Sequence, residues 1–224
     1  MNERLFLAEG TKLVAELLEA GYPIKNIYAL ESWEAPSPDL PITRITPIEL
    51  EKISTLQTPN QVVVVAEQQE PAGEPEWKNK LTLVLDGIQD PGNLGTIIRI
   101  ADWFGIDQII ASNDTVELYN PKVIQATMGS FLRVKIWYRE LEDILTTSKL
   151  PVYGALLSGT SMYVTNPPKE GLLVIGNESK GIRENILPYI KHAITIPRTG
   201  KAESLNAAVA TGILLAQLCA PAGK

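Results

Sequence analysis

Short apolar runs alternate with longer segments of mixed polarity along most of the chain, and this pattern predicts strands separated by helices. The clearest runs are Leu81–Leu85 and Leu172–Ile175, which are almost wholly apolar. Strands of this kind suit a parallel sheet that is buried on both of its faces. Their alternation with helical segments predicts an α/β fold built on a parallel sheet.

The predicted elements fall into two units. In the first unit we expect helices over residues 8–20 and from about Pro47, with strands at 24–30, 42–45 and 62–66. In the second unit we expect strands at 81–85, 108–111, 134–138, 152–157, 172–175 and 193–196, with helices at 93–104, 120–130, 140–147 and from 204 onward. Between them, the segment EQQEPAGEPEWKNK has no periodic apolar pattern. We therefore predict a small α/β unit at 1–70, a linker at 71–80 and a larger unit at 81–224.

Length and composition are those of an ordinary globular protein, with 224 residues of which 45% are hydrophobic and 21% are charged. No apolar run approaches the roughly 18 residues of a membrane span, and no signal segment opens the sequence, so we expect a cytoplasmic protein without a membrane partner. Cys219 is the only cysteine and His192 the only histidine. They exclude an internal disulfide and a Cys/His metal site, and we expect no metal.

The negative charge of the chain is concentrated at its start. The first 70 residues hold 5 Lys or Arg against 11 Asp or Glu, which accounts for the whole net charge of −6. Any binding of RNA must therefore rest on local basic clusters rather than on overall charge. Candidates lie in the second unit: Lys122, Arg133, Lys135, Arg139, Lys180, Arg183, Arg198 and Lys201.

A glycine-rich turn follows the strand at 81–85 and leads into a helix that carries Asn93 and Arg99. Asp86 ends the strand, and ligands gather at the carboxyl ends of strands in such sheets. The glycine spacing G-x4-G-x2-G is not the dinucleotide fingerprint, and Asn-Leu stands where a phosphate-binding P-loop needs Lys and Ser or Thr. Binding of ATP or NAD is therefore disfavoured. Arg99 interrupts an apolar run, so it is either half of a structural salt bridge or a functional cation.

Two further turns end later strands. The segment GNESKG begins at Gly176, and we expect it to lead into a helix that Glu178 could cap. The segment after Pro197 leads to the last helix, where Ser204 is a suitable N-cap and Asn206 falls in the first turn. Beyond Asn206 the helix AAVATGILLAQLCA is apolar nearly all round, which predicts burial by the domain or by a second subunit.

These three segments resemble, in order and spacing, the three motifs of the SpoU (TrmH-like) family of RNA ribose 2′-O-methyltransferases, in the SPOUT superfamily. The matching segments are DGIQDPGNLGTIIRIADWFG, LLVIGNESKGI and IPRTGKAESLNAAVATGILL. The first unit is similar to the small α/β (L30e-like) substrate-binding domain of that family.

The resemblance implies an α/β catalytic domain whose C-terminal segment forms a deep trefoil knot, a rare exception to unknotted topology. It implies S-adenosylmethionine as the cofactor, held in the knot by Gly176, Ile196, Leu205 and, from an earlier strand, Leu156. It also implies a structured rRNA or tRNA as substrate and a homodimer. The chemistry requires no metal.

Site residues are also implied by the resemblance. Arg99 would be catalytic, Asn93, Ser204 and Asn206 would position it and the ribose, and Glu178 would hold a cationic or hydroxyl partner. We expect Arg99 to orient the 2′-hydroxyl rather than to act as a base, because a guanidinium stays protonated in proteins. Structural alternatives are helix caps at Glu178 and Ser204 and a plain tight turn at Gly176.

Three functions are compatible with these features. The first is S-adenosylmethionine-dependent methylation of a ribose 2′-hydroxyl in structured RNA. The second is an inactive RNA-binding or ribosome-assembly module of the same fold, and the third is another nucleotide-dependent α/β enzyme. The absent phosphate motifs disfavour the third, and the filled motif positions favour the first over the second.

Overall fold

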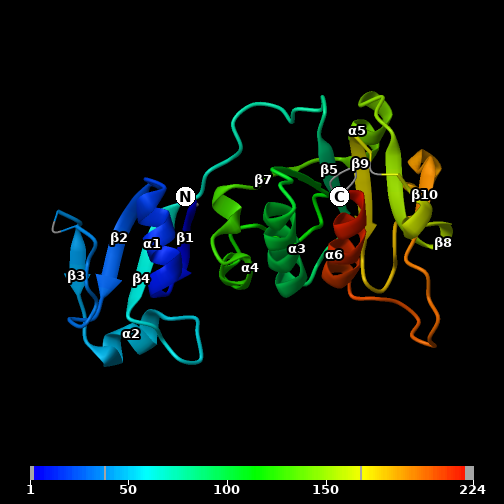
Figure 1. Ribbon diagram of the computed structural model, residues 1–224. Helices are drawn as coiled ribbons and strands as arrows, with labels where there is room; N and C mark the ends of the chain where they lie inside the picture. The colour runs from blue at the N-terminus through cyan, green and yellow to red at the C-terminus, as the bar shows by residue number, and fades with distance from the viewer. Residues whose placement is uncertain (1–2, 38, 167, 220–224) are drawn as a thin grey trace, which may run out of the picture.

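The computed structural model describes residues 3–37, 39–166 and 168–219, and it contains two β-sheets, each with its own helices (Figure 1). The first sheet has four strands in the order β1-β4-β2-β3. They are β1 (Leu5–Glu9), β2 (Ile24–Ala29), β3 (Ile42–Arg44) and β4 (Val62–Glu67). The β1–β4 and β2–β4 pairs are antiparallel, and the β2–β3 pair is parallel.

Two helices complete this small unit. Helix α1 (Thr11–Glu19) buries Leu13, Val14 and Leu17, as the apolar spacing predicts. Helix α2 (Pro47–Ile53) begins with a capping box formed by the residue before it and by its third residue. The prediction of one helix over residues 8–20 is wrong at its start, because β1 pairs with β4 there and Gly10, with φ of 101°, separates strand from helix.

The segment between the two sheets, residues 68–80, has neither helix nor strand but is held in place by hydrogen bonds. The Trp137 indole Nε1 donates to the carbonyl of Gly73 at 3.0 Å, and the backbone N–H of Glu76 donates to the Gln108 amide oxygen at 3.1 Å. The segment is thus irregular, as its prolines predict, but docked onto the second unit.

The second sheet has six strands in the order β10-β8-β9-β5-β6-β7, and every pairing is parallel, as predicted. The strands are β5 (Leu81–Asp86), β6 (Gln108–Ala111), β7 (Lys135–Tyr138), β8 (Val152–Ser161), β9 (Gly171–Gly176) and β10 (His192–Thr195). The helices are α3 (Pro91–Trp103), α4 (Pro121–Thr127), α5 (Leu141–Thr147) and α6 (Ala207–Leu218), with 3₁₀ turns η1 (Ser130–Leu132), η2 (Met162–Val164) and η3 (Leu187–Tyr189).

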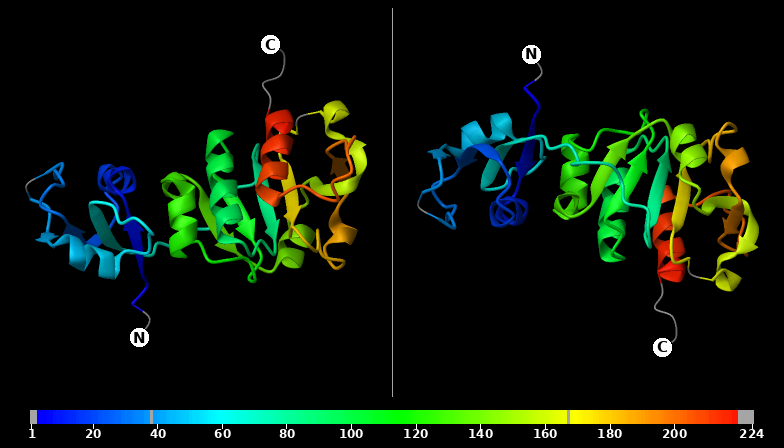
Figure 2. Two further views of the ribbon diagram at one scale, coloured as in Figure 1. Left: turned by 90° about the horizontal axis from the view of Figure 1, so that it is seen from below. Right: turned by 90° about the horizontal axis from the view of Figure 1, so that it is seen from above.

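Both faces of this sheet are covered. Figure 2 shows α4, α3 and α6 side by side on one face, with α5 on the other. Along β5, Leu83 and Leu85 pack into the cluster of the first face with Ile97 of α3, whereas Val84 packs into the second cluster with Leu141 of α5. The alternation explains why the strand is apolar throughout, since successive side chains enter different cores.

The two units contact each other through aromatic side chains. Phe6 of β1 lies with its ring centroid 4.7 Å from that of Tyr119 and 5.9 Å from that of Phe131, both in the second unit. The Tyr22 and Tyr119 hydroxyls are 3.1 Å apart, and burial, followed by this hydrogen bond, raises the pKa of Tyr22. The small unit is therefore packed against α4 and η1 through its first strand.

Two predictions about the second half of the chain are wrong. After β9, residues 177–181 form a tight turn closed by hydrogen bonds between Asn177 and Gly181, and the only helical segment among residues 182–191 is η3. The last helix begins at Ala207, two residues later than an N-cap at Ser204 would start it. Its expected final residue, Ala220, lies outside the described residues.

Candidate active site

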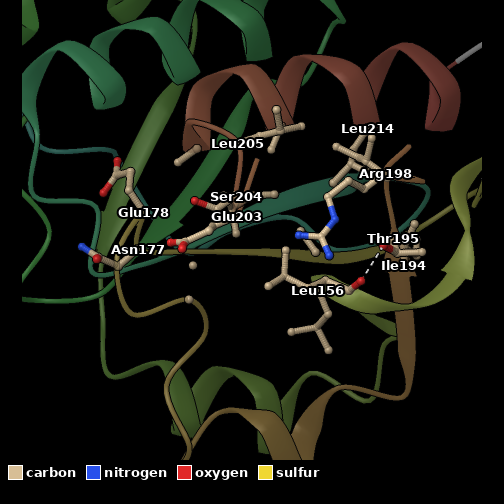
Figure 3. A pocket seen from close by; sticks show the side chains of 18 of the residues that line it. Leu156, Asn177, Glu178, Ile194, Thr195, Arg198, Glu203, Ser204, Leu205 and Leu214 are labelled. Carbon is tan, nitrogen blue, oxygen red and sulfur yellow. Dashed lines mark hydrogen bonds between the residues drawn. The ribbon is translucent and has the colours of Figure 1, made fainter. Parts of the chain in front are cut away.

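The segments that follow β9 and β10 enclose a cavity of about 510 Å³, together with the end of β8 and one side of α6 (Figure 3). Its walls are largely apolar, from Leu156, Leu157, Ile175, Ile194, Ile196, Leu205 and Leu214. Its polar groups include Glu178, Lys180, Arg198, Glu203 and Ser204. A mainly apolar cavity with a few polar groups at the carboxyl ends of parallel strands is a typical ligand site in this fold class.

All four residues predicted to hold the cofactor line this cavity: Leu156, Gly176, Ile196 and Leu205. They come from β8, β9, the end of β10 and the segment before α6, so only the tertiary fold brings them together. Leu205 remains 45% exposed, although it lines the cavity. The cavity is therefore open toward solvent on the side of the last helix.

A chain of hydrogen bonds connects the three motif segments beside the cavity. Asn206 donates from Nδ2 to the Oδ1 atom of Asn93 at 2.8 Å, and Asn93 donates from Nδ2 to Oε1 of Glu178 at 2.5 Å. Asn206 directly precedes α6, Asn93 lies in the first turn of α3, and Glu178 lies in the turn after β9. Three of the five predicted catalytic residues are thus in direct contact.

Asn206 has a local function that the sequence interpretation missed. Its Oδ1 atom accepts hydrogen bonds from the backbone N–H groups of Ala208 and Val209, which makes it the N-cap of α6. The predicted cap, Ser204, is exposed and lines the cavity instead. Because the Asn206 amide caps the helix with its oxygen and reaches Asn93 with its nitrogen, both ends of the side chain are fixed.

Glu178 lies in the tight turn after β9 and caps no helix, so the structural alternative for this residue is wrong. The turn is ordered by Asn177, whose Oδ1 atom accepts from the N–H groups of Ser179 and Lys180 and whose Nδ2 atom donates to the carbonyl of Gly87 at 2.8 Å. These bonds fix the second motif segment to the first. They place the Glu178 carboxylate against Asn93.

An ion pair between a buried carboxylate and a half-buried arginine fixes the same turn from its other end. Asp86, at the end of β5, is 0% exposed and accepts from the backbone N–H of Arg183 at 2.8 Å and from its Nε atom at 2.5 Å. Arg183 also lies 3.5 Å from Asp114. The sequence signals only that Asp86 ends an apolar strand and that Arg183 is basic, so the pairing across 97 positions was not predictable.

Arg99 occupies the exposed face of α3, not the core that its apolar neighbours suggest. Within the described residues it forms no ion pair and no side-chain hydrogen bond that meets ordinary geometric limits. The structural salt bridge proposed as its alternative is therefore absent from this part of the chain. Its guanidinium is available to a ligand from outside.

Arg198 is a further cation of the cavity that the sequence interpretation assigned only to the RNA-facing surface. Figure 3 shows its side chain extending into the middle of the cavity, opposite Leu156. Its Nη1 atom donates to the carbonyl of Ala202 at 2.9 Å. No group of three or more His, Cys, Asp or Glu suited to a metal occurs in the described residues, and none of the described helices is long and apolar enough to cross a membrane.

Replacing Asn93 by aspartate is expected to lower activity at least about 10-fold, because two carboxylates would then face each other where an amide now donates to Glu178. The double variant Asn93→Asp/Glu178→Gln restores one donor and one acceptor with the direction of the hydrogen bond reversed. The activity of the double variant should therefore be higher than the product of the two single losses predicts. Strictly multiplicative losses would show that the two side chains do not act together.

Comparison with known proteins decides the family. The SpoU rRNA Methylase family model matches residues 80–216, and that of the MRM3-like substrate binding domain matches residues 1–64. The chain belongs to the SpoU rRNA methylase family. The recognition made from the three motif segments is confirmed, and with it the predicted enzyme class, an S-adenosylmethionine-dependent RNA 2′-O-methyltransferase.

Relatives in this family are similar over most of the chain. The 23S rRNA (guanosine(2553)-2′-O)-methyltransferase RlmP of Bacillus subtilis is 31% identical over 95% of this chain and 88% of its own length. RlmB of Neisseria meningitidis, a 23S rRNA (guanosine-2′-O-)-methyltransferase, is 33% identical, but the match covers 61% of this chain and 57% of RlmB.

Solved structures of SpoU-type proteins have the same architecture. A TrmH-family protein from Porphyromonas gingivalis is 36% identical, with a TM-score of 0.83 over 96% of this chain and 90% of that one. The rRNA methyltransferase of Sinorhizobium meliloti, solved with bound S-adenosylmethionine, is 29% identical, with a TM-score of 0.83 over 96% of this chain and 87% of that one. The predicted α/β fold with a parallel sheet is confirmed by these matches.

Proposed function

We propose that this SpoU family member methylates a ribose 2′-hydroxyl of structured ribosomal RNA at the cavity beside α6. The observation that carries the proposal is the hydrogen-bonded chain from Asn206 through Asn93 to Glu178, which joins the three motif segments at one edge of the cavity. Ribosomal RNA is preferred to tRNA because the relatives RlmP and RlmB act on guanosines of 23S rRNA. Such a site disfavours the alternative of an inactive module.

The cavity fits S-adenosylmethionine by size and by the chemistry of its walls. Its volume of about 510 Å³ lies within the range of small-molecule sites, and its leucine and isoleucine side chains suit an adenine ring. Glu178 and Glu203 supply carboxylates for the cationic parts of the cofactor, and Arg198 supplies a cation. We assign Leu156, Gly176, Ile196 and Leu205 as the residues that hold it.

The cofactor supplies an electrophilic methyl group on its sulfonium. The residues of the chain then have to align the ribose hydroxyl, bind the neighbouring phosphate and exclude competing orientations, because one in-line displacement needs little more than geometry. Asn93 and Asn206 are held in fixed orientations by their mutual hydrogen bond, and Ser204 faces the same cavity. We assign these three residues to positioning the ribose.

Arg99 binds the 2′-hydroxyl and the adjacent phosphate in this proposal. A guanidinium has donors and no acceptor and stays protonated in proteins, so it orients the hydroxyl without taking its proton. The proton passes to water or to a neighbouring acceptor. Glu178, which Asn93 holds in place by a hydrogen bond, binds a cationic part of the cofactor at the edge of the cavity.

We further propose the division into a small substrate-binding domain at 1–70, a linker at 71–80 and a catalytic domain at 81–224, the last of which contains a trefoil knot. Two separate sheets and two separate family matches support the division. The knot is supported by the family membership of the second unit and by the hydrogen bonds that fix the turn after β9 against β5. We place the enzyme in the cytoplasm, since its bacterial relatives act on ribosomal RNA.

The outer face of α6 supports a homodimer. Val209 is 50% exposed, and Ile213 and Ala216 lie on the same side of the helix at the following turns. An apolar stripe next to the open side of the cavity is suited to a second copy of the same surface, because a two-fold interface is self-complementary. We propose that α6 packs against α6 of a partner subunit beside the active site.

Val209→Asp is expected to convert the dimer into a monomer, because it buries two unpaired carboxylates at a two-fold interface. Sedimentation at micromolar protein concentration measures the change. Ile48→Asp is the matched control, since Ile48 is a 67% exposed apolar side chain on α2 of the small unit. A wild-type chain that sediments as a monomer, or equal behaviour of the two variants, contradicts the assigned interface.

The proposed reaction is tested by incubating the chain with radiolabelled S-adenosylmethionine and with ribosomal RNA or tRNA lacking the modification, followed by nuclease digestion. We expect label in ribose-methylated nucleosides of rRNA. Alkali cleaves RNA through the free 2′-hydroxyl, so a 2′-O-methyl group protects the phosphodiester bond on its 3′ side. Alkaline hydrolysis therefore leaves the label in dinucleotides. Label in single nucleotides would contradict a ribose target, and label in tRNA alone would contradict the preference for ribosomal RNA.

A further inference from the structure

Trp103, at the end of α3, is 84% exposed and is the most exposed large apolar side chain in the described residues. The three other tryptophans are covered: Trp33 is 5% and Trp137 4% exposed, and Trp77 packs against the second apolar cluster. Exposing an indole to water costs free energy that a folded protein ordinarily avoids. Tryptophan is among the residue types that are enriched where proteins bind other molecules.

The position of Trp103 connects it to the catalytic helix face. Gly92, Thr96, Arg99 and Trp103 are all exposed and recur at the spacing of one side of an α-helix. Trp103 lies one turn, about 6 Å along the axis, beyond Arg99, and about 15 Å beyond Asn93. A molecule that contacts Arg99 from outside therefore passes over or close to the indole.

The charges near Trp103 admit an anionic chain. Asp102 is the adjacent carboxylate, and Arg133 binds it with an Nη2–Oδ2 distance of 2.9 Å. Arg133 also pairs with Glu16 of the small unit at 3.1 Å. Arg133 pairs with both carboxylates but balances the charge of only one of them. Arg99 is the unpaired cation of the exposed stripe within the described residues, and these four charges together sum to zero.

We propose that Trp103 stacks on an unpaired base of the RNA substrate, a few nucleotides from the methylated ribose, while Arg99 holds the ribose and phosphate. The proposal rests on the proposed function, since it requires RNA on Arg99. Stacking on an aromatic side chain is the usual way in which proteins hold splayed bases, and it tolerates any base. Trp103 thus extends the binding site along the strand without selecting its sequence.

A second copy of the chain is a poorer occupant of this surface. Protein contact would bury the Arg99 guanidinium without a partner from its own chain, which is costly. The apolar stripe of Val209, Ile213 and Ala216 on α6 offers a better surface for that purpose. RNA, in contrast, supplies phosphates for Arg99 and a flat base for the indole.

The test compares wild type, Trp103→Ala, Trp103→Phe and the control Leu187→Ala, which truncates an exposed apolar side chain of η3. Binding to total ribosomal RNA and total tRNA is measured with S-adenosylhomocysteine present, and KM and kcat are measured for methyl transfer. We expect Trp103→Ala to weaken RNA binding and to raise KM about 10-fold, with kcat and cofactor affinity within about two-fold of wild type. Phenylalanine should restore most of the binding, and the control should resemble wild type.

Two further measurements separate stacking from other causes. Because stacking releases no counterions, the slope of log affinity against log salt should be the same in Trp103→Ala as in wild type. RNA should also quench the fluorescence of the exposed tryptophan in wild type and not in Trp103→Phe. Unchanged RNA binding by Trp103→Ala overturns the proposal, and so does loss of binding that coincides with dissociation of the dimer. If wild type itself binds and methylates no RNA, the proposed function fails as well.

Discussion

Replacing Arg99 by alanine is expected to lower the turnover number about 100-fold or more, while the affinity for S-adenosylmethionine stays within a few-fold of wild type. Arg99 is exposed, makes no ion pair within the described residues and does not line the cavity, so its loss leaves both the fold and the cofactor site intact. What is lost is the orientation of the ribose hydroxyl. Single-turnover methyl transfer and calorimetric titration of the cofactor measure the two quantities.

Arg99→Lys is the matched variant, because lysine keeps the charge but loses the planar pair of donors. We expect it to recover RNA binding but only a small part of the turnover, if a guanidinium has to hold hydroxyl and phosphate together. A thermal unfolding midpoint close to that of wild type is expected in both variants. Parallel losses of stability and of cofactor binding would instead show that Arg99 supports the fold.

Gly176→Val is expected to abolish binding of S-adenosylmethionine at the concentrations that saturate wild type. A Cβ atom at this position would overlap with backbone atoms of Gly181 and Ile182, so the turn that carries Glu178 could not close on β9. The cavity wall formed by residues 176–181 would be displaced. The glycine is thus required first by the turn itself, and the effect on the cofactor follows from the displaced wall.

Gly200→Val is the control for this variant. Gly200 lies in the loop after β10, its φ is not in the left-handed region, and an added Cβ would meet nothing within 4 Å. Its cofactor affinity should stay within a few-fold of wild type. If Gly176→Val binds S-adenosylhomocysteine as tightly as wild type does, the turn after β9 is not part of the cofactor site.

The elements that could be predicted are those whose signal is local. Strands β5 and β9 are short apolar runs, and α4 begins at Pro121, directly after its N-cap Asn120. A parallel sheet is covered on both of its faces, so its central strands are apolar throughout. The continuous apolar runs therefore also predicted that the sheet is parallel. The three motif segments identified the family because they combine residues at fixed spacing.

Features that depend on distant partners could not be predicted. The segment GNESKG has the composition of a helix start, but Asn177 and Gly181 bond to each other and the turn closes on β9. Ser204 and Asn206 are both good N-caps, and the choice of Asn206 is linked to its contact with Asn93, 113 positions away. The apolar sequence around Arg99 suggested burial, yet its side chain is exposed, while the faces of α3 on either side of it contact other helices.

The last helix is apolar nearly all round, which predicted burial by the domain or by a second subunit. The structure buries Ala207, Thr211, Leu214 and Leu218 and leaves Val209 half exposed. The glycine at position 212 lets α6 lie close to Ile100 of α3. The remaining apolar face is what the proposed second subunit would cover. Cys219 caps the end of the helix, and burial raises the pKa of its thiol.

The measurement that tests the central claim most directly is calorimetric titration of the purified wild-type chain with S-adenosylhomocysteine. The cavity formed by the segments after β9 and β10 should bind it with a dissociation constant on the order of micromolar, about −8 kcal/mol, and the Gly176→Val chain should show no heat of binding. Absence of binding by wild type, both alone and with ribosomal RNA present, would contradict the assignment of this cavity as the cofactor site.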